Sequence, residues 1–153
     1  MPLDIDYSKV LEQSKENPVF YVNYAYSRIN SVFKQAETIL AGNDTSDAVL
    51  AAAPLARLTS PEELALIKHL ASWPQTVEGA ALANEPHRIA FYLLELAANF
   101  HSLWAAGKGD VKMRFLLEGD LELSNARLAL LRATSNIILS GFSVMGVVPL
   151  EIM

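Results

Sequence analysis

The chain has 153 residues, of which 52% are hydrophobic and 19% charged, and its formal net charge is −5. This composition excludes intrinsic disorder, which requires low hydrophobicity and high net charge. The absence of cysteine excludes disulfides, thiol catalysis and cysteine-ligated zinc. The length fits a single domain, residues 1–153. The mean hydropathy of +0.22 indicates that some apolar surface contacts a partner or another part of a larger protein.

No targeting segment or membrane span is expected. The opening residues MPLDIDYSKV are acidic where a signal peptide requires a basic start. Residues 133–150 carry no charge, but they contain serines, glycines and a proline, so we predict that they are buried protein core. These features favour a cytoplasmic protein.

Helical periodicity dominates the first half of the chain. A short helix is expected over residues 7–16, and Pro18 suits the first turn of a long helix to about residue 41. The apolar positions of that helix step by three and four: Val22, Tyr26, Ile29, Phe33, Ala36 and Leu40. Residues 42–58 are expected to form an internal connector, whose alanines allow a short helix.

Helix signals continue in the second half. Ser60-Pro61-Glu62-Glu63 has the serine cap, the proline and the later glutamate of a helix start. The expected helices cover residues 60–73, 75–83, 86–106 and 121 to at least 140. Gly107-Lys108-Gly109-Asp110 is expected to end the third of these, and residues 111–121 form either a loop or a frayed strand. The predicted fold class is therefore all-α, a helical bundle.

Residues typical of catalysis are missing. His69, His87 and His101 lack metal-ligand spacing, so we expect them to be surface or packing residues and expect no metal site. The GKGD sequence at 107–110 is too short for a phosphate-binding loop. We expect the chain by itself to have no catalytic activity.

The helix over 18–41 has an unusual second face. Tyr21, Tyr24 and Arg28 lie along it, roughly opposite the apolar positions. Such a composition is typical of a stacking or interface site, although another helix of the bundle could equally cover these residues. In the helix over 86–106, the pattern places Phe100 in the core and Trp104 at its margin. Arg127 and Arg132 are expected to be solvated.

Four blocks of sequence, in chain order, resemble those of a known family: NPVFYVNYAYSRI (17–29), EPHRIAFYLLELAANFHSLW (85–104), NARLALLRA (125–133) and GVVPLEIM (146–153). Their order and content are similar to the C-terminal DALR-type anticodon-binding domain of arginyl-tRNA synthetases. The third block keeps the alanine, arginine and leucine of the DALR motif. The family often has glutamine and histidine where this chain has Asn23 and Tyr26.

The resemblance implies that the chain binds the anticodon stem and loop of tRNA-Arg. A loop can splay its bases outward, and aromatic rings then stack on them. The positions that match contact residues of the family are Tyr21, Asn23, Tyr24, Phe100, Trp104 and Met153. Arg28 is added to these predicted contact residues because it shares the helix face of Tyr21 and Tyr24. The resemblance also shifts the expectation for Phe100 from core towards partial exposure.

The resemblance further implies a longer parent enzyme, with a catalytic domain N-terminal to this one. The HIGH-type and KMSKS-type signatures are absent from the chain, so ATP and magnesium are expected in that other domain, and no cofactor is expected in this one. The apolar end, residues 147–153, is expected to fold back and bring Met153 towards the anticodon, or else only to seal the core. The alternatives to RNA binding are a free-standing helical adaptor that binds protein through the Tyr21/Tyr24 face and, less favoured, a small helical enzyme.

Overall fold

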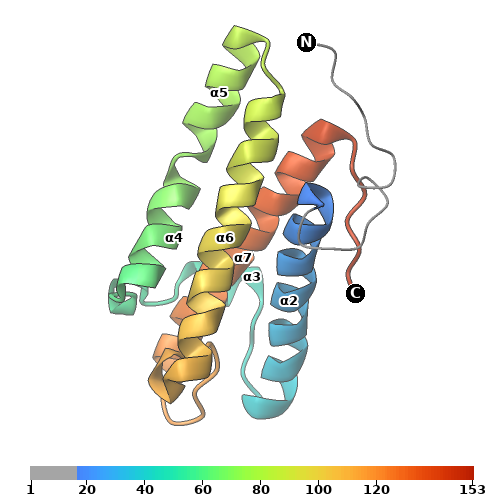
Figure 1. Ribbon diagram of the computed structural model, residues 1–153. Coiled ribbons are helices and arrows are strands. Elements are labelled where there is room, and N and C mark those ends of the chain that lie inside the picture. The colour runs from blue at the N-terminus through green and yellow to red at the C-terminus, as the bar shows by residue number, and fades with distance from the viewer. Residues whose placement is uncertain (1–16) are drawn as a thin grey trace.

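The computed structural model describes residues 17–153, and the helix predicted over 7–16 lies outside them. The elements are α2 (Pro18–Ile39), α3 (Asp47–Ala51), the 3-10 turn η1 (Leu55–Arg57), α4 (Pro61–Ala71), α5 (Trp73–Ala83), α6 (His87–Gly109), the 3-10 turn η2 (Val111–Met113) and α7 (Leu121–Met145) (Figure 1). Residues 17–153 contain no strand, which confirms the all-α prediction. The short helix α3 confirms the helical option for the connector, and η2 shows that the strand option for 111–121 was wrong.

Helix α2 and helix α4 begin where the sequence predicts, because side chains satisfy their free backbone N–H groups. The Asn17 side-chain oxygen accepts from the N–H groups of Val19 and Phe20. At α4, the Ser60 hydroxyl accepts from the Glu63 N–H, while the Glu63 carboxylate accepts from the Ser60 N–H, which is a complete capping box.

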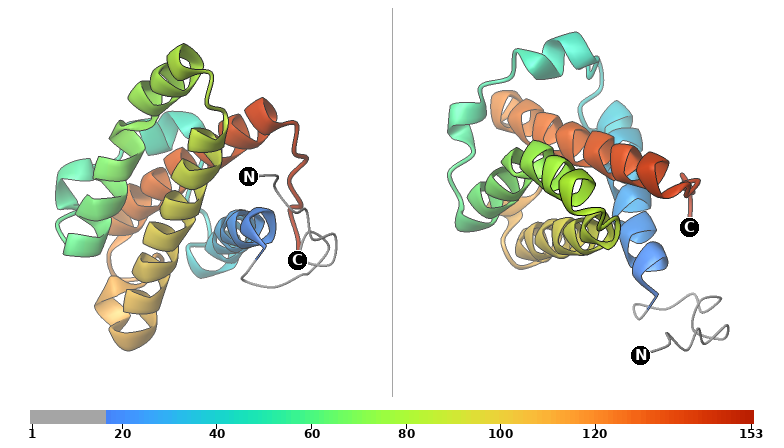
Figure 2. Two further views of the ribbon diagram at one scale, coloured as in Figure 1. Left: turned by 45° about the horizontal axis from the view of Figure 1, so that its top comes forward. Right: turned by 90° about the horizontal axis from the view of Figure 1, so that it is seen from above.

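Helix α6 occupies the centre of the bundle, and it contacts α2, α4, α5 and α7. Figure 2 shows α4 and α5 along one side of α6, with α2 on another side and α7 crossing behind. The helix continues to Gly109, beyond the predicted end near residue 106. The helix nevertheless ends within Gly107-Lys108-Gly109-Asp110, as predicted, and its last turn packs against η2.

The predicted apolar stripe of α2 is mostly buried, but Phe33 is an exception. Val22, Ile29 and Ala36 are at most 2% exposed. Phe33 is only half-buried, and Val32 takes the core position beside it. The guanidinium of Arg132 lies 4.2 Å from the centre of the Phe33 ring, so the ring is covered by a cation at the edge of the core.

Helix α7 is, within residues 17–153, the one helix long and apolar enough to cross a membrane by length and composition. It also supplies several fully buried core residues: Leu128, Leu131, Ile138 and Phe142. The prediction of a buried core for residues 133–150 is thus right for one face of α7, which includes Ile138 and Phe142. It is wrong for the opposite face, where Val144 is 60% exposed, and for the tail, where Val148 is 84% exposed. Gly146 separates the two with a φ of +69°, a left-handed conformation that favours glycine and turns the chain back.

Candidate nucleic-acid interface

Helices α2 and α6 bring three of the predicted site residues into one stack. The guanidinium of Arg28 lies 4.2 Å from the centre of the Tyr24 ring and 4.7 Å from the centre of the Trp104 ring. Arg28 also donates a short hydrogen bond to the Tyr24 hydroxyl. All three side chains are half-buried. We call these residues the Tyr24–Arg28–Trp104 stack, and it offers planar, cationic surface of the kind that binds unstacked bases.

Further rings support this stack from the N-terminal side. The ring of His101 lies 4.9 Å from that of Tyr21 and 5.7 Å from that of Tyr24. Phe20 is nearly parallel to Tyr24, with ring centres 6.4 Å apart. Tyr21 packs against the core and is half-buried, so it supports the face more than it projects from it. The predicted contacts missed Phe20 and His101, although each is adjacent in sequence to a predicted site residue.

Asn23 does not face solvent, because it binds the C-terminal tail. It is only 5% exposed. Its amide donates to the Leu150 carbonyl at 3.3 Å and accepts from the Leu150 N–H at 2.8 Å. Ser27, one turn later, donates to the same carbonyl at 3.0 Å. Ser27 was not among the predicted site residues, because nothing in the local sequence pattern distinguishes a serine that binds the distant tail.

These bonds confirm that the tail folds back, and Figure 1 shows it descending beside α2. The sulfur of Met153 lies 2.8 Å from the Asn23 amide nitrogen, while the side chain remains 45% exposed. Leu150 and Ile152 are also exposed, at 59% and 73%. The tail therefore does not simply seal the core, and it adds exposed apolar surface beside Asn23 and Ser27 of α2.

Phe100 is fully buried, so the expected partial exposure is wrong. Its ring lies parallel to that of Phe115 at 6.1 Å and tilted against that of Trp104 at 6.0 Å. Helix α6 is surrounded by other helices on most sides, and position 100 faces the interior. In this structure Phe100 supports Trp104 from behind and presents no surface to a base.

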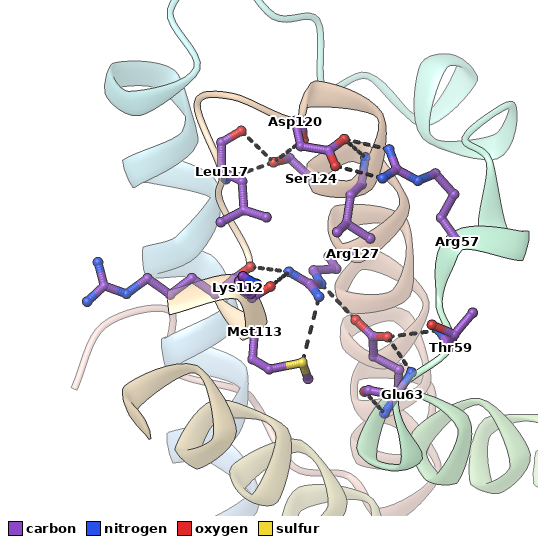
Figure 3. Close-up of polar contacts among 12 residues, drawn as sticks. Arg57, Thr59, Glu63, Lys112, Met113, Leu117, Asp120, Ser124 and Arg127 are labelled. Atoms are coloured by element: carbon purple, nitrogen blue, oxygen red, sulfur yellow. Dashed lines mark hydrogen bonds and ion pairs between the residues drawn. The ribbon is translucent and has the colours of Figure 1, made fainter. Parts of the chain in front are cut away.

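Arg127 is also buried, at 4% exposure, although a solvated side chain was expected. Its Nε donates to Glu63 at 2.7 Å. One terminal nitrogen donates to the carbonyls of Lys112 and Arg114 at 2.8 and 2.6 Å (Figure 3). This arginine thus joins α4, α7 and the segment after α6.

The same corner contains a second arginine pair. Arg57 forms two bonds to Asp120, at 2.5 and 2.6 Å, and Asp120 also caps α7 by accepting from the Leu123 N–H (Figure 3). The Arg57 hydrogen bonds hold the pKa of the Asp120 carboxyl below its ordinary value. Burial alone would raise the pKa of Glu63, but the bonds from Arg127 and Ser60 outweigh it and lower that pKa. Both carboxylates therefore stabilise the fold in their ionised form.

Within residues 17–153, no group of three or more His, Asp or Glu side chains is arranged to hold a metal ion. His69 packs its ring 4.2 Å from that of Tyr92, and its Nε2 lies 3.0 Å from the Tyr92 carbonyl oxygen. Burial raises the pKa of Tyr92 to about 12. This histidine is a packing residue, as predicted.

Residues 17–153 thus form an all-α bundle in which α2 and α6 carry an aromatic and arginine face. Residues 22–153 match the DALR anticodon binding domain family, and the chain belongs to that family.

Named relatives agree with this assignment. The chain is 52% identical over 150 residues to an arginine–tRNA ligase of Ruegeria pomeroyi, and the match covers 98% of the chain and 26% of the relative. It is 55% identical over 149 residues to an arginine–tRNA ligase of Cereibacter sphaeroides, covering 97% and 25%. The solved Thermus thermophilus arginyl-tRNA synthetase superposes with a TM-score of 0.73 at 25% identity, covering 97% of this chain and 23% of that one. The chain therefore spans about a quarter of the length of the curated relatives it matches.

Proposed function

We propose that the chain binds the anticodon loop of tRNA-Arg through the Tyr24–Arg28–Trp104 stack, with Met153 beside it. The observation that carries the proposal is the position of Arg28, 4.2 and 4.7 Å from two half-buried aromatic rings in a domain of this family. Each base that stacks on such a surface contributes about 1–3 kcal/mol. Stacking explains how a chain with a net charge of −5 can bind RNA, since few phosphate contacts are then required.

We also propose that the chain is one domain of a larger protein. The relatives are named arginine–tRNA ligases and are about four times as long as the matched region, which supports a catalytic domain of the same protein as a partner. That domain would bind ATP and magnesium and attach arginine, while this one positions the tRNA in the cytoplasm. Apolar side chains that are more than half exposed, such as Leu55 and Leu64, supply surface that such a domain would cover.

The test is binding of a synthetic RNA hairpin that carries the anticodon stem and loop of an arginine tRNA. Tyr24→Ala should weaken binding about tenfold or more, because a stacking surface is lost, whereas Tyr24→Phe should retain most of it. Phe91→Ala is the matched control, since Phe91 is 63% exposed on α6 but makes no ring contact with this stack. Equal affinity of Tyr24→Ala and wild type would exclude the stacking role.

The adaptor hypothesis predicts a different salt dependence. RNA binding weakens as salt rises, because phosphate contacts release counterions. An apolar protein interface at Tyr21 and Tyr24 would respond little to salt. Membership of an anticodon-binding family favours the RNA interpretation.

A further inference from the structure

A pocket of about 410 Å³ adjoins the Tyr24–Arg28–Trp104 stack. It lies between the C-terminal half of α2, the end of α6 and the segment that follows η2. Trp104 forms part of both the stack and the pocket wall, and Phe115 lies beside it with ring centres 5.9 Å apart. Small-molecule sites occupy roughly 300–1,000 Å³ and are mostly apolar with a few polar groups. The size and the aromatic wall therefore suit a single nucleotide.

The rim of this pocket is positively charged, unlike most of the chain. Three of the 12 lysines and arginines lie between residues 108 and 114, where Asp110 is the one acid. Lys108 and Arg114 line the pocket and are exposed, together with one acid, Glu118. Neither cation takes part in an ion pair within the described residues. Two cations that form no ion pair with residues 17–153, beside an aromatic wall, are suited to a phosphate attached to a base.

The segment that carries Arg114 is held in place from behind. Arg127 donates to the Lys112 and Arg114 carbonyls, as described above. Gly107 allows the segment to approach α6 closely, since a Cβ at this position would lie 3.1 Å from the Met113 carbonyl oxygen and 3.3 Å from the Arg114 Cα. The buried Glu63–Arg127 pair thus fixes the backbone that forms one wall of the pocket.

We propose that this pocket is a second nucleotide subsite, which binds a loop nucleotide neighbouring the one at the Tyr24–Arg28–Trp104 stack. The base would pack against Trp104, with the Gln35 amide at its edge, and a phosphate would lie between Lys108 and Arg114. The subsite rests on the proposed function, because it extends the same RNA-binding face.

The test measures binding of the same RNA hairpin by fluorescence anisotropy at several potassium chloride concentrations. Lys108→Ala and Arg114→Ala should each weaken binding several-fold, and each should lower the slope of log affinity against log salt by about 0.7, the value for one contact to single-stranded RNA. Lys68→Ala removes an equal charge from an exposed position on α4 that does not line the pocket, so it should change neither quantity. Similar losses from all three variants would mean general electrostatic attraction and would overturn the subsite.

A second variant tests the space itself. Ile39 lines the pocket and is 38% exposed, so Ile39→Trp should narrow the pocket without removing charge. We expect weaker binding with an unchanged melting temperature. If Tyr24→Ala weakens binding while the Ile39, Lys108 and Arg114 variants all bind like Lys68→Ala, the subsite is wrong and the proposed function stands. If the wild-type chain does not bind the hairpin, both are wrong.

Discussion

Two arginines in this molecule perform opposite tasks. Arg127 is 4% exposed, and its guanidinium is used by Glu63 and by two backbone carbonyls. Arg28 is half-buried, and its guanidinium lies against the rings of Tyr24 and Trp104. The Arg127 guanidinium is enclosed by the fold, whereas Arg28 remains partly exposed. The comparison shows that the burial of an arginine follows from its partners: a carboxylate and backbone carbonyls enclose Arg127, whereas aromatic rings leave Arg28 partly exposed and available for the proposed RNA contact.

The largest effect should come from Arg127→Ala. Removing one partner of a buried ion pair leaves the other charge unpaired, which typically costs about 3–5 kcal/mol. The loss also leaves the Lys112 and Arg114 carbonyls without their donor. Chemical denaturation of both proteins measures the difference in the free energy of unfolding. A cost below about 1 kcal/mol would contradict the structural role assigned to Arg127.

A smaller effect is expected from Glu63→Gln, about 1.5–3 kcal/mol, because Arg127 keeps its carbonyl acceptors. The pKa of Glu63 is lowered in the fold, so its stabilisation is complete above its unfolded value of about 4.3 and is lost as pH falls through the lower folded value. Unfolding experiments from pH 7 to pH 2 should therefore show a shallower acid dependence for the variant. Some dependence should remain, because the pKa of Asp120 is lowered as well.

Asn23→Ala should cost about 1–3 kcal/mol, the range for losing a partner of buried polar groups. The Asn23→Ala substitution should also release the tail, so carboxypeptidase should remove Met153 from the variant faster than from the wild type. Asn30→Ala is the control, since Asn30 is an amide of the same helix without a hydrogen bond to the described tail. Equal rates of cleavage for the two variants would show that Asn23 does not hold the tail.

The helices were predictable because their signals are local: Asn17 and Ser60 cap helices within three residues of themselves. The pairing of Tyr24, Arg28 and Trp104 was partly predictable, since two of them share a helix face and the resemblance supplied the third. The burial of Phe100 and Arg127 was not predictable, because it depends on which helices surround these side chains. The bonds from Asn23 to Leu150 cross 127 residues of sequence, and no periodicity within α2 reveals them.

The smallest change in stability should come from Arg28→Lys, which keeps the charge but replaces a planar group by a compact ammonium. Stacking of a cation on a ring contributes about 0.5–1 kcal/mol at exposed sites, so the melting temperature should fall only slightly. Binding of the RNA hairpin should nevertheless weaken, because a lysine cannot provide the flat surface that a base requires. Arg132→Lys is the matched control: Arg132 lies 4.2 Å from the Phe33 ring, outside the proposed site. If both lysine variants bind the hairpin as tightly as wild type, the positive charge of Arg28 is sufficient for binding, and its flat guanidinium is not required.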